Sequence, residues 1–259
     1  MLRIFSSIRQ GLLNEGKTSK YFRYAIGEII LVVVGILIAL QVNNWNIERA
    51  EAKLGQEYIH RLIEDLERDI INIDSRTALA ELRLGFGQLL KDAVSDTQVA
   101  LDNRGEFLAA IVSVARVSPV YLSKDTFEEL RSTGYLRLLD RETKSVLFEY
   151  FSYYDERGLN VEPNKMMAHT FLENAYKIIN FQYTDIQFPV ATQRIIEEIR
   201  EMEVDESLVV ETLNRMRENE DLLASLESVY QQQRREIRIN GSMRRRAEDA
   251  LAALKAAQN

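Results

Sequence analysis

The chain has no cysteine among its 259 residues, which excludes disulfide bonds, thiolate nucleophiles and cysteine-ligated zinc sites. Proline and glycine are also scarce, with 3 and 11 residues respectively. Because these two residue types are the main breakers of helices, their scarcity in so long a chain favours helical structure.

Histidine is nearly absent as well, with 2 residues, and no Ser-His-Asp pattern or glycine-rich phosphate loop occurs. Glu57, His60 and Glu64 share one face of an expected helix and form half of a di-iron signature. The second half is missing, because Met166 stands where an acid would have to precede His169. We therefore expect no metal, no cofactor and no catalytic residue, with His60 exposed.

A basic surface is lacking too, since the net charge is −7. The first 23 residues hold five basic residues and one acid, a charge of +4, so the remainder carries −11. Nucleic-acid binding requires a basic surface to meet the phosphates, and we therefore expect no nucleic-acid partner.

One long hydrophobic run is present. Residues 25–42 contain only Glu28 and Gln41 as polar residues. As a helix they would rise about 27 Å, close to the roughly 30 Å of a bilayer core. No small-x-small cleavage site follows, which argues against a removed signal peptide. The run predicts a transmembrane helix over residues 21–45.

The flanks of this run predict its anchors and its orientation. Tyr21 and Tyr24 at one end and Trp45 at the other match the aromatic belts at membrane interfaces. The basic, amphipathic residues 1–20 should remain in the cytoplasm. Residues 46–259 then form an extracytoplasmic domain attached to the cytoplasmic membrane, in the periplasm of a Gram-negative cell.

Three residues of the predicted span are candidates for contacts within the membrane. Glu28 is an acid at a costly depth, so it is either a polar contact to another span or a side chain that reaches back to the interface. Gly35 and Ala39 form a small-xxx-small pair that permits close helix packing. Self-association through this helix is one expectation for a partner, besides the lipid bilayer.

The stretch "YAIGEIILVVVGILIALQVNNWN" (residues 24–46), preceded by "IRQGLLNEGKTSKY", resembles the N-terminus of a bacterial family of single-span membrane proteins of unknown function. A second segment, "TFEELRSTGYLRLL" (residues 126–139), resembles part of the soluble region of that family. The resemblance implies a single span and a helical body, and it brings no activity, cofactor or catalytic residue.

The remainder of the chain predicts an all-α helical bundle with two long helices. Apolar residues spaced by three and four form the seam of a first long helix that "GFGQ" (residues 85–88) could bend or end. This seam packs within its own domain or pairs with a second chain, and we favour the former. The seam residues are Ile59, Leu62, Leu66, Ile70, Ile73, Thr77, Ala80 and Leu84.

Local signals predict the boundaries of the other helices. A helix over residues 104–117 should stop at Ser118-Pro119. A helix capped by Ser123 or Asp125 should end at Gly134. Asp140 should cap a helix over residues 141–157. Further helices are expected over 160–181, 192–202, 206–239 and 243–258, with a possibly extended stretch at 182–191 and a break at Asn240-Gly241.

An aromatic cluster formed by Phe148, Tyr150, Phe151, Tyr153 and Tyr154 is either the lining of a small-molecule pocket or part of the core, and we favour core. Three function classes remain. We expect a non-enzymatic interaction or scaffold protein. The alternatives are a sensory or ligand-binding domain that signals through a partner and, least favoured, a carboxylate-based hydrolase or metal enzyme.

Overall fold

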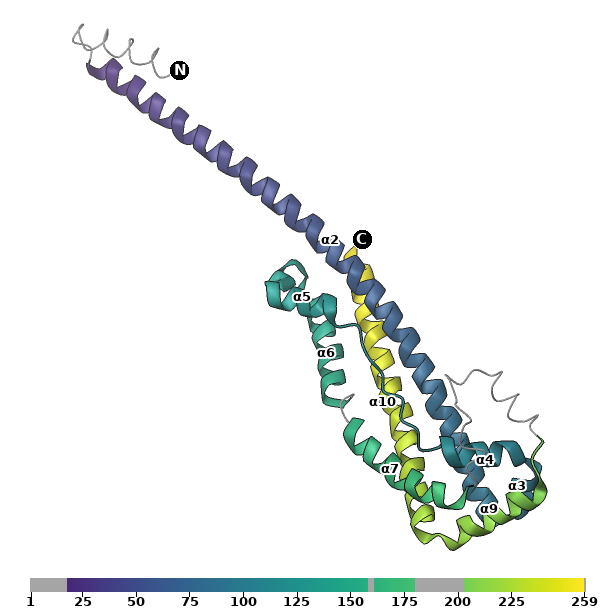
Figure 1. Ribbon diagram of the computed structural model, residues 1–259. Helices are drawn as coiled ribbons and strands as arrows, with labels where there is room; N and C mark the ends of the chain where they lie inside the picture. Colours follow the sequence, from purple (N-terminus) through teal and green to yellow (C-terminus); the bar gives the residue numbers. More distant parts are fainter. Residues whose placement is uncertain (1–17, 158–160, 180–202, 259) are drawn as a thin grey trace. The chain divides into compact units, whose positions relative to one another are not determined.

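The computed structural model describes residues 18–157, 161–179 and 203–258, and every regular element within them is helical. The all-α prediction is confirmed. The predicted extended stretch 182–191 and the helix predicted over 192–202 lie outside the described residues. In chain order (Figure 1) the elements are α2 (Thr18–Ser95), α3 (Thr97–Asp102), α4 (Arg104–Ser113), α5 (Asp125–Thr133), the 3-10 helix η1 (Tyr135–Leu138), α6 (Arg141–Arg157), α7 (Val161–Ile178), α9 (Glu206–Glu218) and α10 (Glu220–Gln258).

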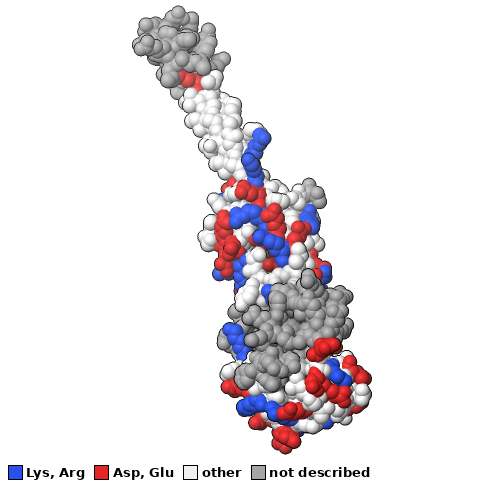
Figure 2. Space-filling view, turned by 45° about the vertical axis from the view of Figure 1, so that its right-hand side comes forward, with Lys and Arg blue, Asp and Glu red and all other residues white. Residues whose placement is uncertain are grey.

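The chain divides into two compact units, residues 1–57 and residues 58–259. In the first unit, the large apolar side chains from Ile29 to Val42 are 46% to 63% exposed. Figure 2 shows this part of α2 as a nearly uncharged surface, whereas acidic and basic residues alternate over the described surface of the second unit. α2 is the one described helix that is long and apolar enough to cross a membrane.

The second unit is built on an antiparallel pair, in which residues 58–95 of α2 run along α10 (Figure 1). Buried apolar residues at spacings of three and four line both helices, as expected for helices that share a core. Of the predicted seam, Ile59, Leu62, Leu66, Ile73 and Ala80 are buried. The ion pairs along this contact are Lys255–Glu67 (2.8 Å), Arg244–Asp74 (2.7 Å) and Lys91–Glu227 (2.6 Å).

The helix ends of this pair differ from the predictions. α2 does not end at residues 85–88 but continues to Ser95. There Gly87 lies so close to α10 that a Cβ on it would stand 2.9 Å from Cδ2 of Tyr230. The predicted break at Asn240-Gly241 is also wrong, because α10 runs through it to Gln258. The break falls instead at Asn219, which separates α9 from α10 and whose Oδ1 accepts a hydrogen bond from the Leu222 N–H (2.9 Å).

A segment without regular structure, residues 114–124, follows α4. The predicted helix end at Ser118-Pro119 is therefore too late, since α4 ends at Ser113. Side chains of the long helices satisfy the segment's backbone. Gln233 Nε2 donates to the Val114 carbonyl (3.0 Å), and Asn72 Nδ2 donates to the Tyr121 carbonyl (2.6 Å). These bonds hold the segment beside the antiparallel pair.

The 3-10 helix η1 connects α5 to α6. Gly134 ends α5 in the left-handed conformation (φ 76°), and Asp140 Oδ1 accepts from the Thr143 N–H (2.8 Å) at the start of α6, so both predicted caps are confirmed. The N-cap of α5 is Lys124, not Ser123 or Asp125.

Candidate functional site: a cationic cavity

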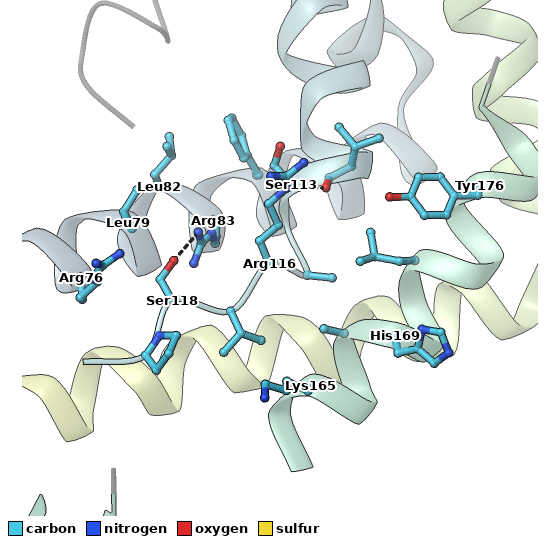
Figure 3. Close-up of a pocket in the computed structure, with 17 residues that line it drawn as sticks. Arg76, Leu79, Leu82, Arg83, Ser113, Arg116, Ser118, Lys165, His169 and Tyr176 are labelled. Atoms are coloured by element: carbon cyan, nitrogen blue, oxygen red, sulfur yellow. Dashed lines mark hydrogen bonds between the residues drawn. The ribbon is translucent and has the colours of Figure 1, made fainter. Parts of the chain in front are cut away.

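The second unit contains a cavity of about 600 Å³ between α2, the 114–124 segment and α7 (Figure 3). Its volume lies within the range of small-molecule sites, about 300–1,000 Å³. We call it the cationic cavity, and its lining follows from the helix periods. Arg76, Leu79, Arg83 and Phe86 recur at spacings of three and four, so they form one stripe of α2 that faces the cavity.

The cavity floor is apolar. Phe86, Val112 and Ala168 are buried members of the main hydrophobic core, and Leu172 packs against that core while half-buried. Contact of such a surface with water is unfavourable. The surface is well suited to an apolar ligand group.

The charged lining is entirely basic. Arg76 and Arg83 come from α2, Arg116 from the 114–124 segment, and Lys165 and His169 from α7, and the described residues of the lining include no Asp or Glu. His169 Nε2 lies 3.3 Å from Oε1 of Glu173 outside the cavity. A concave site lined by one sign of charge concentrates ions of the opposite sign, so the cavity favours anions.

Arg83 is the most unusual of these residues, because its guanidinium is buried, with 8% of the residue exposed. Nη2 donates to Ser118 Oγ (2.8 Å; Figure 3), whereas the buried Nη1 has no hydrogen-bond partner. A buried donor without a partner costs about 1–3 kcal/mol in desolvation free energy, and a charged donor costs more. An anion in the cavity would remove that cost.

Burial lowers the pKa of Arg83 to about 10, and the nearby Arg116 and Arg76 lower it further, while Glu236 opposes the shift. Arg83 is therefore still a cation at neutral pH. Glu236 lies on the far side of the Val117–Pro119 stretch, where Asn164 Nδ2 donates to its Oε1 (3.3 Å). Burial raises the pKa of Glu236, against the opposing effect of Gln232, Arg83 and Arg235. Among the described residues, Glu236 is thus the acid that favours the charged form of Arg83.

A second polar atom in the lining is also unsatisfied. The hydroxyl of Ser113 at the end of α4 is buried and has no hydrogen-bond partner. Arg116, three residues further along the chain, uses Nε to donate to the Val112 carbonyl (3.4 Å). Tyr176 approaches from α7 with its hydroxyl turned inward (Figure 3). The cavity therefore presents hydrogen-bond donors of two chemical kinds, guanidinium and hydroxyl.

The residues predicted for the span lie elsewhere, in the first unit. Glu28 is half-buried, and Gly35 and Ala39 are exposed on one face of α2, with nothing within 4 Å of a Cβ placed on Gly35. Trp45 is 56% exposed, and the Arg49 guanidinium lies 5.7 Å from the centre of its ring. Tyr21 and Tyr24 lie in α2, but their side chains fall outside what the structure describes.

The residues weighed for a metal site form only a pair. His60 Nε2 lies 3.3 Å from Oε1 of Glu64, and both side chains are exposed. Within residues 18–157, 161–179 and 203–258, no group of three or more potential ligands could hold a metal ion.

The aromatic cluster of α6 packs into the α5–α6 contact and does not line the cationic cavity. Phe127 stacks on Phe151 with ring centres 4.4 Å apart, and Phe148 meets Phe127 edge-on at 5.3 Å. The buried Tyr150 hydroxyl donates to Asp69 Oδ2 (2.9 Å). Tyr176, which lies nearby in the sequence, is the one aromatic residue of that region found in the lining.

Comparison with known proteins concerns the first part of the chain. Residues 28–121 match a family of unknown function, DUF6090. The predicted resemblance to such a family is confirmed for this range, whereas residues 126–139, which also prompted it, lie outside the match. The matched segment contributes Arg76, Arg83 and Arg116 to the cavity, and α7 lies beyond it. No curated protein and no solved structure matches the chain.

Proposed function

We propose that the protein is a membrane-anchored, non-catalytic binding protein whose helical domain holds a small anion in the cationic cavity. The observation that carries this proposal is the buried guanidinium of Arg83, a residue that lines the cavity and whose Nη1 has no hydrogen-bond partner among the described residues. Folding tolerates an unpaired buried charge at a cost, and such costs recur at functional sites. The ligand-binding class, ranked second from the sequence, is thereby favoured over a scaffold.

Binding rather than catalysis fits the side chains that the cavity offers. Among the described residues, the lining offers cations, hydroxyls and apolar groups, with no carboxylate to act as a general base. Such a lining orients a ligand by charge and by shape.

The membrane anchor is part of the same proposal. The exposed apolar side chains of α2 between Ile29 and Val42 support a span over residues 21–45. The basic residues before the span support a cytoplasmic N-terminus, so that the cavity lies in an extracytoplasmic domain.

A scaffold role remains the second candidate. Ile71 and Tyr121 are 70% and 68% exposed, and Asn72, which follows Ile71, bonds to the Tyr121 carbonyl. Two large apolar side chains at neighbouring surface positions suit a protein contact.

The test is the thermal stability of the full-length chain in lipid nanodiscs with hexanoate, hexyl phosphate or neutral hexanol. Since a ligand that binds only the folded state stabilises it, the anions should raise the melting midpoint and hexanol should not. Arg83→Met should remove the response. Arg215→Gln, which changes an exposed arginine on α9 that pairs with Glu211, should leave it intact. Equal responses of Arg83→Met and the unaltered protein would contradict the proposal.

A further inference from the structure

The α2 stripe of the cationic cavity has a basic residue at one end and an apolar residue at the other, and this arrangement restricts the chemical class of the ligand. Along the α2 stripe, Arg76 is half-buried at one end, Arg83 is buried in the middle, and Phe86 lies in the core at the other end. These three residues span ten positions, about 15 Å of helix. The stripe therefore leads from a charged, open end to an apolar, closed one.

The cations gather around one point of this stripe. Arg76 and Arg116 lie close enough to Arg83 to disfavour its charge, so the three guanidiniums repel one another when the cavity holds no anion. A single compact anionic head relieves this repulsion and gives Arg83 Nη1 its missing acceptor. Ser113 Oγ supplies a further donor in the same lining.

The part of the cavity that an anionic head leaves unfilled favours an apolar group of the ligand. An inorganic anion would fill a small part of about 600 Å³ and would leave Phe86, Val112 and Leu172 against water. A ligand that carries charges along its whole length would bring some of them against these apolar walls, which offer no partner of opposite charge.

We propose that the cavity binds an amphipathic anion, with one carboxylate or phosphate-monoester head at Arg83 and an unbranched apolar body along Phe86 and Leu172. This inference rests on the proposed function, and it adds the class of ligand. A free acid and a lipid fragment both offer a head of this chemistry.

The decisive experiment measures affinity against chain length for the full-length protein in nanodiscs. Acetate, butanoate, hexanoate and octanoate form one series, the corresponding alkyl phosphates a second, and inorganic phosphate and octanol are the reference compounds. Empty nanodiscs correct for partition into lipid. Each methylene that enters the apolar part should tighten binding about fourfold, the value that corresponds to burying one methylene group.

Two variants test separately how the anionic head and the apolar body of the ligand contribute to affinity. Arg83→Met should weaken octanoate binding on the order of 10- to 100-fold, because a hydrogen bond to a charged group is lost. Its melting midpoint without ligand should be unchanged or higher, since a buried unpaired charge is gone. Leu172→Asn should leave acetate binding intact and flatten the dependence on chain length. Arg215→Gln should behave as the unaltered protein.

The outcomes distinguish the two proposals. Equal affinities for acetate and octanoate, or for phosphate and octyl phosphate, would overturn the amphipathic ligand while leaving anion binding in place. Octanol binding as tightly as octanoate, or full octanoate affinity in Arg83→Met, would overturn both. Preference for the phosphate series over the carboxylate series would point to a lipid-derived head, and the reverse to a free acid.

Discussion

Asp69 and Arg83 are two of the buried charged residues of the domain, and their surroundings differ. Asp69 is 2% exposed, and its two carboxylate oxygens accept from the Ser123 N–H (2.8 Å) and the Tyr150 hydroxyl (2.9 Å). Arg83 is nearly as buried, yet one of its terminal nitrogens has no partner. The paired acid joins α2 to α6 and to the 114–124 segment, as a structural group does. The unpaired base faces a cavity.

Tyr150→Phe tests the structural role of Asp69. Burial raises the pKa of Asp69, so this residue favours folding when protonated, and its contribution is lost as pH rises through the folded pKa. Removing the Tyr150 hydroxyl deprives the carboxylate of a donor and should raise that pKa further. We therefore expect a loss of about 1–2 kcal/mol in the free energy of unfolding at neutral pH. The loss should shrink below about pH 4, where Asp69 is protonated in both states.

The measurement is chemical denaturation of both proteins between pH 3 and 8. Tyr121→Phe is the matched control, since Tyr121 is 68% exposed and its variant should stay within about 0.5 kcal/mol of the unaltered protein. A loss for Tyr150→Phe that is the same at every pH would argue against a coupling to Asp69.

At the scale of the elements, two glycines of α2 show how packing overrides local preference. Gly85 and Gly87 lie one residue apart on either side of Phe86, and both were predicted to disturb the helix. A Cβ on Gly85 would meet nothing within 4 Å, whereas one on Gly87 would meet Tyr230 of α10. Gly85 only lowers the local helix propensity of α2, which its packing contacts offset. Gly87 permits a close approach of α2 and α10.

Alanine at each position should separate these roles. Gly85→Ala should stabilise the protein by up to about 1 kcal/mol, the difference in helix propensity. Gly87→Ala has the same gain in propensity, but its Cβ would stand 2.9 Å from the Tyr230 ring, so it should be less stable than Gly85→Ala and no more stable than the unaltered protein. Thermal unfolding of the two variants provides the comparison, and equal gains would show that Tyr230 moves aside freely.

The sequence predicts the elements where the signal is local. Asp140 and Gly134 act through hydrogen bonds and backbone angles of their own neighbours, and both were predicted. The continuation of α10 through Asn240-Gly241 was not, because it depends on the apolar stripe that packs against α2. The break at Asn219 could have been found, since an asparagine followed by two acids is a common helix start.

The cationic cavity could not be predicted in this way. Its residues come from α2, the 114–124 segment and α7, and only the tertiary fold brings them together. One signal was available in the sequence: Arg83 lies three residues after Ala80, a helical spacing that also belongs to a buried seam, although Leu84 was assigned to the seam in its place. A basic residue on a buried seam suggests a ligand or a counter-ion, and the seam alone does not say which.

At the scale of the whole molecule, the proposed topology can be tested independently of any ligand. A reporter that is active only outside the cytoplasm, fused after Asn259, should be active, because the basic N-terminal residues favour the cytoplasmic side. The same reporter fused directly after Lys20, before the span, should be inactive. Full-length expression of the first fusion without activity would reverse the orientation.

The pairing of α2 with α10 also governs when this domain can form during synthesis. Glu67 and Asp74 meet Lys255 and Arg244, which are separated from them by 188 and 170 positions in the chain. Contacts so distant in sequence carry a large loop-closure entropy and slow the folding of a chain. Until α10 has been synthesised, the apolar face of α2 that packs against it remains exposed. A nascent chain of this protein should therefore depend on chaperones, and removal of α10 should lead to degradation.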